Sequence, residues 1–136
     1  RASTPREGTD LTIFASSWMV HRSLEAAETL ASEGISVEVV DPRTLVPLDE
    51  EAILRSVAKT GRLLVVDECH LRCGVGSEIA ATVAEHAYGD LLAPIRRLAT
   101  LDVPVPFSPP LEQYVEPTTA KILAAARSVT GVQSGA

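Results

Sequence analysis

The chain has 136 residues, of which 46% are hydrophobic and 22% charged, so it is the size of one ordinary domain and is not of a disordered or fibrous class. Its formal net charge of −6 disfavours nucleic acid and anionic lipid as partners. No apolar run approaches the roughly 20 residues of a membrane helix and no signal-peptide pattern opens the chain, so we expect a soluble, intracellular protein without a membrane partner.

Residues 1–10 are polar and contain a proline and a glycine, which predicts a linker or tether. Periodicity then predicts strands at 11–16, 35–41, 62–67 and 93–100, and helices at 17–34, 49–58, 77–88 and 118–129. Gly34 is expected to end the first helix in the left-handed conformation, and Gly61 to end the second. We therefore place one domain at residues 11–130 and a flexible tail at 131–136.

Two of the predicted strands differ in pattern. Leu63 to Val66 is apolar without alternation, which is typical of a central strand covered on both faces. In the strand at 35–41, Ser36 and Glu38 alternate with apolar residues, which predicts a partly exposed face near a sheet edge. Strands that alternate with helices through short connections favour βαβ crossovers. The predicted fold class is α/β, with three layers (α/β/α) around a mostly parallel sheet of about five strands.

A polar cluster, Asp67, Glu68, Cys69, His70 and Cys73, follows the predicted central strand, where open α/β sheets place ligand sites. A zinc site built from its two cysteines and histidine lacks a second ligand pair. Either thiol would need His70 as its base, yet neighbouring residues on an extended chain point apart. Two ordinary thiols in a loop are the simpler interpretation, and a thiol enzyme built on Cys73 stays open as an alternative.

Gly74, Gly76 and Ser77 open the predicted helix at 77–88, where backbone amides and the helix dipole favour an anion. This pattern suits a small-anion-binding regulatory module. No Lys follows as in a P-loop, and the dinucleotide-binding fingerprint is absent. The glycines also fit a tight turn without any ligand, and both interpretations stay open.

The sequence contains two further histidines that are candidate catalysts. His21 lies early in the first predicted helix, and His86 falls near the buried stripe of the helix at 77–88. We interpret both as packed or interface residues. The residues themselves therefore predict no catalytic, cofactor-binding or metal-binding side chain.

Several segments resemble a known family. They are residues 34–49, 60–68, 76–80, 93–98 and 103–109. Together they are similar to the transketolase C-terminal domain as found in beta subunits of 2-oxo acid dehydrogenases, over about residues 8–130. Transketolases and deoxyxylulose-phosphate synthases share the first half, whereas 103–109 followed by Leu111 and Glu112 resembles the oxo acid dehydrogenase branch. Arg72 and Cys73 also resemble acetoin dehydrogenase beta subunits.

The resemblance implies a C-terminal assembly domain cut from a larger enzyme. That enzyme decarboxylates a 2-oxo acid oxidatively on thiamine diphosphate with Mg²⁺, and acylates a lipoyl group. In this family the cofactor contacts and the catalytic histidine belong to the preceding domain, so His21, His70 and His86 inherit no role. We expect this chain alone to be inactive and to hold no cofactor. The family implies a bacterial cytoplasm or a mitochondrial matrix.

The resemblance also implies partners. They are an alpha subunit, a second beta subunit, and the peripheral-subunit-binding domain of the acyltransferase, which meets an acidic surface. The net charge of −6 agrees with that use. Family members often carry an acidic residue just before the Ala-Pro of the last predicted strand, where this chain has Leu92. Asp90, two residues earlier, is therefore the candidate for the partner-binding surface.

Overall fold

The computed structural model describes residues 3–15, 19–41, 50–70, 75–100 and 118–131. Its elements are β1 (Ser3–Arg6), β2 (Leu11–Ala15), α1 (Met19–Ser32), β3 (Val37–Asp41), α2 (Glu50–Thr60), β4 (Leu63–His70), α3 (Val75–His86), the short 3-10 helix η1 (Tyr88–Asp90), β5 (Arg96–Thr100) and α5 (Thr119–Thr130). This confirms the predicted order of strands and helices from residue 11 onward. Within these ranges, none of the helices combines the length and the apolar character needed to cross a bilayer.

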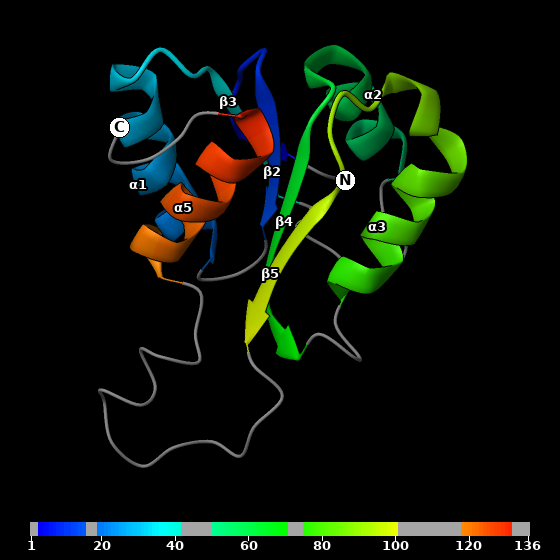
Figure 1. Cartoon of the computed structure of the whole chain (residues 1–136). Coiled ribbons are helices and arrows are strands. Elements are labelled where there is room, and N and C mark those ends of the chain that lie inside the picture. Colours follow the sequence, from blue (N-terminus) through cyan, green and yellow to red (C-terminus); the bar gives the residue numbers. More distant parts are fainter. Residues whose placement is uncertain (1–2, 16–18, 42–49, 71–74, 101–117, 132–136) are drawn as a thin grey trace.

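The strands form one sheet in the order β1-β3-β2-β4-β5, in which only the β1–β3 pair is antiparallel. The chain runs from β2 to β3 on one side, and then crosses back to reach β4 on the other side of β2. Because each crossover between parallel strands is right-handed, a connection that runs one way along the sheet and a connection that runs the other way lie on opposite faces of the sheet. Figure 1 shows this result, with α1 and α5 covering one face and α2 and α3 the other. The predicted three-layer α/β/α fold with a mostly parallel sheet is confirmed.

Alternate side chains of each inner strand point into two separate cores. On β2, Leu11 and Ile13 pack beneath α1 and α5, whereas Phe14 packs beneath α2 and α3. β4 follows the same alternation, with Leu64 on the first side and Leu63 on the second. Both faces of these strands are therefore dry, as the unbroken apolar run in β4 predicted.

Glycines end the first two helices as the sequence predicted. Gly34 has φ of +86° and Gly61 has φ of +74°, the left-handed region in which a side chain is strained. The amide of Gly34 donates to the carbonyl of Ala31 at 3.0 Å, and that of Gly61 to Val57 at 2.7 Å. These bonds satisfy carbonyls that the last helical turns would otherwise leave open.

Three predictions about the sheet were wrong in detail. The central strand is β2, and the apolar strand β4 lies beside it. β3 lies next to the edge strand β1, as predicted, but its polar face is not exposed, since α2 covers Glu38, which is only 4% exposed. Residues 3–6, expected to be part of a linker, form β1. A polar sequence suits that strand because it lies at the sheet edge, where two of its side chains face solvent.

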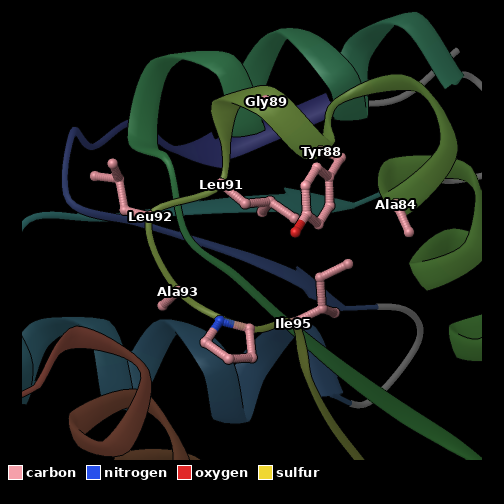
Figure 2. Close-up of a pocket in the computed structure, with 8 residues that line it drawn as sticks. Ala84, Tyr88, Gly89, Leu91, Leu92, Ala93 and Ile95 are labelled. Atoms are coloured by element: carbon pink, nitrogen blue, oxygen red, sulfur yellow. The ribbon is translucent and has the colours of Figure 1, made fainter.

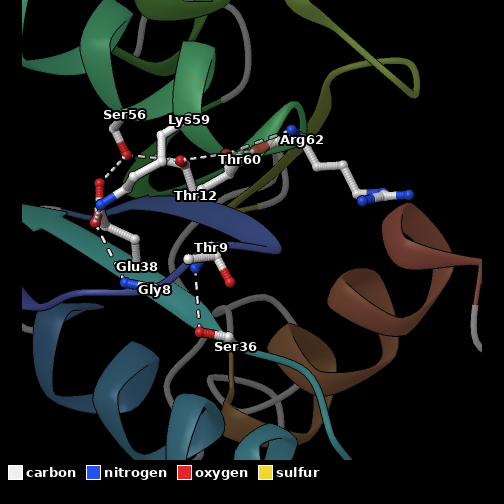
Figure 3. A network of polar contacts seen from close by, with 9 residues as sticks. All are labelled: Gly8, Thr9, Thr12, Ser36, Glu38, Ser56, Lys59, Thr60 and Arg62. Atoms are coloured by element: carbon white, nitrogen blue, oxygen red, sulfur yellow. Dashed lines mark hydrogen bonds and ion pairs between the residues drawn. The ribbon is translucent and has the colours of Figure 1, made fainter.

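Polar side chains run in a row between the sheet and α2, inside the second core (Figure 3). The hydroxyl of Thr12 on β2 lies 2.7 Å from those of Ser56 and Thr60 on α2. Ser56 in turn donates to Oε2 of Glu38 at 2.5 Å, and the ammonium of Lys59 pairs with Oε1 of the same carboxylate. This row satisfies the polar groups that α2 brings to the sheet.

The carboxylate of Glu38 depends on these donors for its charge. Burial by itself raises the pKa of Glu38, but hydrogen bonds from Lys59, Ser56 and the Gly8 amide outweigh it, so the pKa lies below its ordinary value of 4.5. A carboxyl whose pKa is lower in the folded state stabilises the fold above its unfolded pKa. That contribution is lost as the pH falls through the folded pKa.

The substitution Glu38→Gln should therefore remove part of the acid sensitivity of the fold. We expect the free energy of unfolding, measured by urea titration, to fall less between about pH 5 and about pH 3 than in the unsubstituted chain. Glu28→Gln serves as the control, because Glu28 is exposed on α1. If the unfolding free energy of Glu38→Gln falls as steeply with decreasing pH as that of the unsubstituted chain, this account is contradicted.

Candidate partner-binding surface

Four of the five residues in the predicted polar cluster lie at the carboxyl edge of the sheet. Asp67 to His70 are the last residues of β4, and Asp67 and His70 align with Ala99 and Thr100 of β5. The side chains of this segment, and Cys73 altogether, lie outside the described part of the chain. Among the described residues, no group of three or more His, Cys, Asp or Glu could hold a metal ion. The interpretation as ordinary loop thiols and its alternative, a thiol enzyme built on Cys73, both stay predictions.

The glycine-rich turn predicted as an anion site is described only in part. Gly76 and Ser77 belong to the first turn of α3, whereas Gly74 lies outside the described residues, and so does the side chain of Ser77. A helix does begin where the anion hypothesis needs one. The hypothesis itself remains a prediction.

The two other histidines are both exposed. His21 on α1 lines a shallow hollow of about 430 Å³ beside β1. The expectation that His86 lies near a buried stripe was wrong, since its side chain is 53% exposed and lies 3.9 Å from Glu85. The buried stripe runs through Ile79 and Val83 of α3 and continues to Ala87, the residue just after the helix. Residues four positions apart advance slightly more than one helical turn. The buried stripe therefore shifts around the helix, away from position 86.

Asp90, the candidate contact residue, lies in η1 between α3 and β5. A groove of about 620 Å³ occupies this corner. It is lined by Ala84, Tyr88, Gly89, Leu91, Leu92, Ala93, Pro94 and Ile95. Tyr88 is 77% exposed and Leu92 is 69% exposed, and Asp90 is itself exposed between them. Figure 2 shows Leu92 projecting away from Tyr88, on the other side of the connection.

The backbone of this corner is held by hydrogen bonds. The amide of Asp90 donates to the carbonyl of Ala87 at 2.9 Å, and that of Leu91 to Tyr88 at 3.2 Å. The amide of Leu92 donates to the carbonyl of Gly61 at 2.7 Å, which ties the corner to the turn between α2 and β4. The carboxylate of Asp90 is therefore presented from an anchored turn.

The groups at this corner are suited to non-covalent contact with another molecule. Its lining offers an apolar surface and a phenol, with the carboxylate of Asp90 beside them, and no nucleophile with an adjacent base. Large apolar side chains that are exposed near one another are typical of protein-binding surfaces. The sequence had singled out Asp90 and Leu92, but not Tyr88. The helical pattern predicted Tyr88 inside the helix, whereas α3 ends two residues earlier.

Comparison with known proteins identifies the family of this domain. A model of the transketolase C-terminal domain matches residues 1–122. The chain belongs to the transketolase C-terminal domain family. The match includes β1, so this family domain covers the residues expected to be a linker. The resemblance to transketolase-type domains is confirmed.

Relatives of this family member are longer proteins. The beta subunit of acetoin:2,6-dichlorophenolindophenol oxidoreductase from Cupriavidus necator is 52% identical over 126 residues, which are 93% of this chain and 37% of that protein. The mitochondrial beta subunit of the pyruvate dehydrogenase E1 component from Dictyostelium discoideum is 45% identical over 130 residues, covering 96% of this chain and 36% of that one. The chain thus spans little more than a third of either.

A solved structure agrees with the fold. The chain described as a split gene transketolase, inactive beta4 tetramer, superposes with a TM-score of 0.83 at 30% identity. The superposition covers 97% of this chain and 42% of that one. The three-layer arrangement is therefore that of transketolase-type C-terminal domains.

The substitution Gly61→Ala tests how the Asp90 corner is held. A methyl group at position 61 would lie 2.7 Å from two carbons of Leu92, and the left-handed φ adds strain. We expect a loss of about 1–3 kcal/mol of unfolding free energy from strain, plus displacement of Leu92. Urea titration and the amide NMR shifts of residues 90–93 measure the two effects.

Gly34→Ala is the matched control, because Gly34 has the same backbone strain with nothing within 4 Å of the added methyl. It should lose stability without moving the shifts of residues 90–93. Equal shift changes in the two variants would contradict the packing of Leu92 on Gly61.

Proposed function

We propose that this chain is the C-terminal assembly domain of the beta subunit of a thiamine-diphosphate-dependent 2-oxo acid dehydrogenase. The observation that carries the proposal is 45% identity, over 96% of this chain, with the beta subunit of a pyruvate dehydrogenase E1 component. The parent enzyme decarboxylates a 2-oxo acid oxidatively and acylates lipoyl groups. The domain serves association between beta subunits and binding to the acyltransferase core.

The cofactors belong to the rest of such an enzyme. Thiamine diphosphate and Mg²⁺ would be held by the preceding domain of the beta subunit together with the alpha subunit. One observation supports this division: the chain spans 37% or less of the two relatives. An alpha subunit and a second beta subunit are the partners that follow.

The corner around Asp90 is the proposed contact for the peripheral-subunit-binding domain of the acyltransferase. Three features support it: the exposed carboxylate, the exposed side chains of Tyr88 and Leu92 beside it, and the net charge of −6. A basic partner is attracted to this surface, and apolar side chains add contact area. Leu92 in place of an acid makes this contact less dependent on charge than one built on two carboxylates.

Sedimentation of the chain with the cognate peripheral-subunit-binding domain tests the assignment. We expect a complex at low salt that weakens at high salt. Asp90→Asn should weaken it about two- to fivefold, the range for an exposed ion pair. Glu28→Gln makes the same charge change on α1 and should have no effect. If the two variants bind alike, Asp90 is not the contact. If neither they nor the unsubstituted chain bind, the docking role fails.

Acetoin dehydrogenase is the second candidate for the parent enzyme. It is favoured by the 52% identity with the acetoin:2,6-dichlorophenolindophenol oxidoreductase subunit, against 45% for the pyruvate dehydrogenase subunit. A complete beta subunit that carries this domain, assayed with its alpha subunit, should then reduce dichlorophenolindophenol with acetoin faster than with pyruvate or branched 2-oxo acids. A preference for a 2-oxo acid would return the assignment to the first candidate.

A further inference from the structure

Residues 3–10, here called the N-terminal strap, comprise β1 and the turn into β2. The turn is hydrogen-bonded to β3 and the residue just before it. The amide of Thr9 donates to the hydroxyl of Ser36 at 3.1 Å, and the amide of Asp10 donates to the Ser36 carbonyl at 2.7 Å. The amide of Ser36 donates back to Oδ2 of Asp10 at 2.7 Å. The amide of Gly8 donates to Oε1 of Glu38 at 3.2 Å. The strap is therefore held mainly by bonds to Ser36 and Glu38, and the carbonyl of Asp10 also accepts from Arg62 at 3.5 Å.

Gly8 makes this approach possible. A Cβ added there would lie 2.3 Å from the carbonyl carbon of Val37 and 2.6 Å from the backbone nitrogen of Glu38. No side chain fits so close to another backbone. Only a glycine lets the strap come near enough for its amide to reach the carboxylate.

The same carboxylate is bound from the opposite side by α2. Oε1 of Glu38 also pairs with the ammonium of Lys59, and Oε2 accepts from Ser56. The side chain of Glu38 is 5% exposed, whereas that of Lys59 is 46% exposed. Figure 3 shows Glu38 between Gly8 on one side and Ser56 and Lys59 on the other. The buried carboxylate of Glu38 thus joins Gly8 of the strap to α2, more than forty residues further along the chain. One of its partners on α2 is the ammonium of Lys59, which solvent can reach.

We propose that Glu38 is a charge-dependent latch that holds the N-terminal strap on the sheet, with Lys59 as its solvent-accessible control. When both groups are charged, the carboxylate accepts from Gly8 and stays fixed under α2. Loss of either charge weakens the bond to Gly8 and lets the strap open while the two cores stay folded. In a longer beta subunit the strap is where the chain would enter this domain, so the latch would set the direction of that entry. This last step rests on the proposed function.

Two physical reasons favour local opening over global unfolding. The strap lies at the sheet edge and none of the large buried apolar side chains belongs to it, so its opening exposes little apolar surface. A hydrogen bond to a charged acceptor is stronger than one to a neutral amide of the same shape. Replacing the carboxylate by an amide therefore weakens the strap more than the core.

Hydrogen exchange of the 136-residue chain tests the latch at single amides. In Glu38→Gln, the exchange rate of the Gly8 amide should rise about tenfold or more, with a smaller rise in β1. The amides of β2 and β4 should rise far less. Lys59→Met should raise Gly8 exchange in the same pattern, and Lys59→Arg should restore most of the protection by keeping the charge.

Glu33→Gln is the matched control, because Glu33 forms an ion pair with Arg127 that joins α1 to α5 and does not touch the strap. It should leave Gly8 exchange unchanged. Unchanged Gly8 exchange in Glu38→Gln overturns the latch, as does an equal rise at every amide. If Glu38→Gln does not fold, Lys59→Met decides, since that side chain is half exposed. No partner is needed, so the result is independent of the docking experiment.

Discussion

Burial of β2 on both faces is the constraint on which the rest of the structure depends. All five residues of this strand are buried, and it is paired on both sides by parallel neighbours. A strand with no wet face needs a helical layer above and below it. The chain meets this need with connections that run in both directions along the sheet, so that helices cover both of its faces.

The two helical layers are joined to the sheet by different chemistry. The interface with α1 and α5 is almost wholly apolar, and it is clamped at its rim by the ion pair of Glu33 with Arg127. The interface with α2 contains the buried hydroxyls and the carboxylate of Glu38. Apolar side chains stay in contact when a helix shifts slightly. The buried polar groups under α2 can all be hydrogen-bonded in only one arrangement. The polar row therefore sets the position of α2 and, through Gly8, that of the N-terminal strap.

The Asp90 corner carries the most exposed large apolar side chains of the described residues. These are Tyr88 and Leu92, which flank Asp90 in the sequence. The chain belongs to a C-terminal domain family, and its longer relatives include beta subunits of an acetoin oxidoreductase and of pyruvate dehydrogenase. The strap and the Asp90 corner lie on different elements, so substitutions can alter the two regions separately.

The sequence by itself determined the α/β class, the order of the elements from residue 11 and the glycines that end two helices, because periodicity and backbone strain are local properties. It also pointed to Asp90 through a family resemblance. Only the tertiary structure decided that Glu38 is buried, that residues 3–6 are a strand, and that His86 is exposed. Those outcomes depend on which segment covers a face or pairs with an edge. Strand pairing and helix packing join residues far apart in the chain, and no local pattern contains that information.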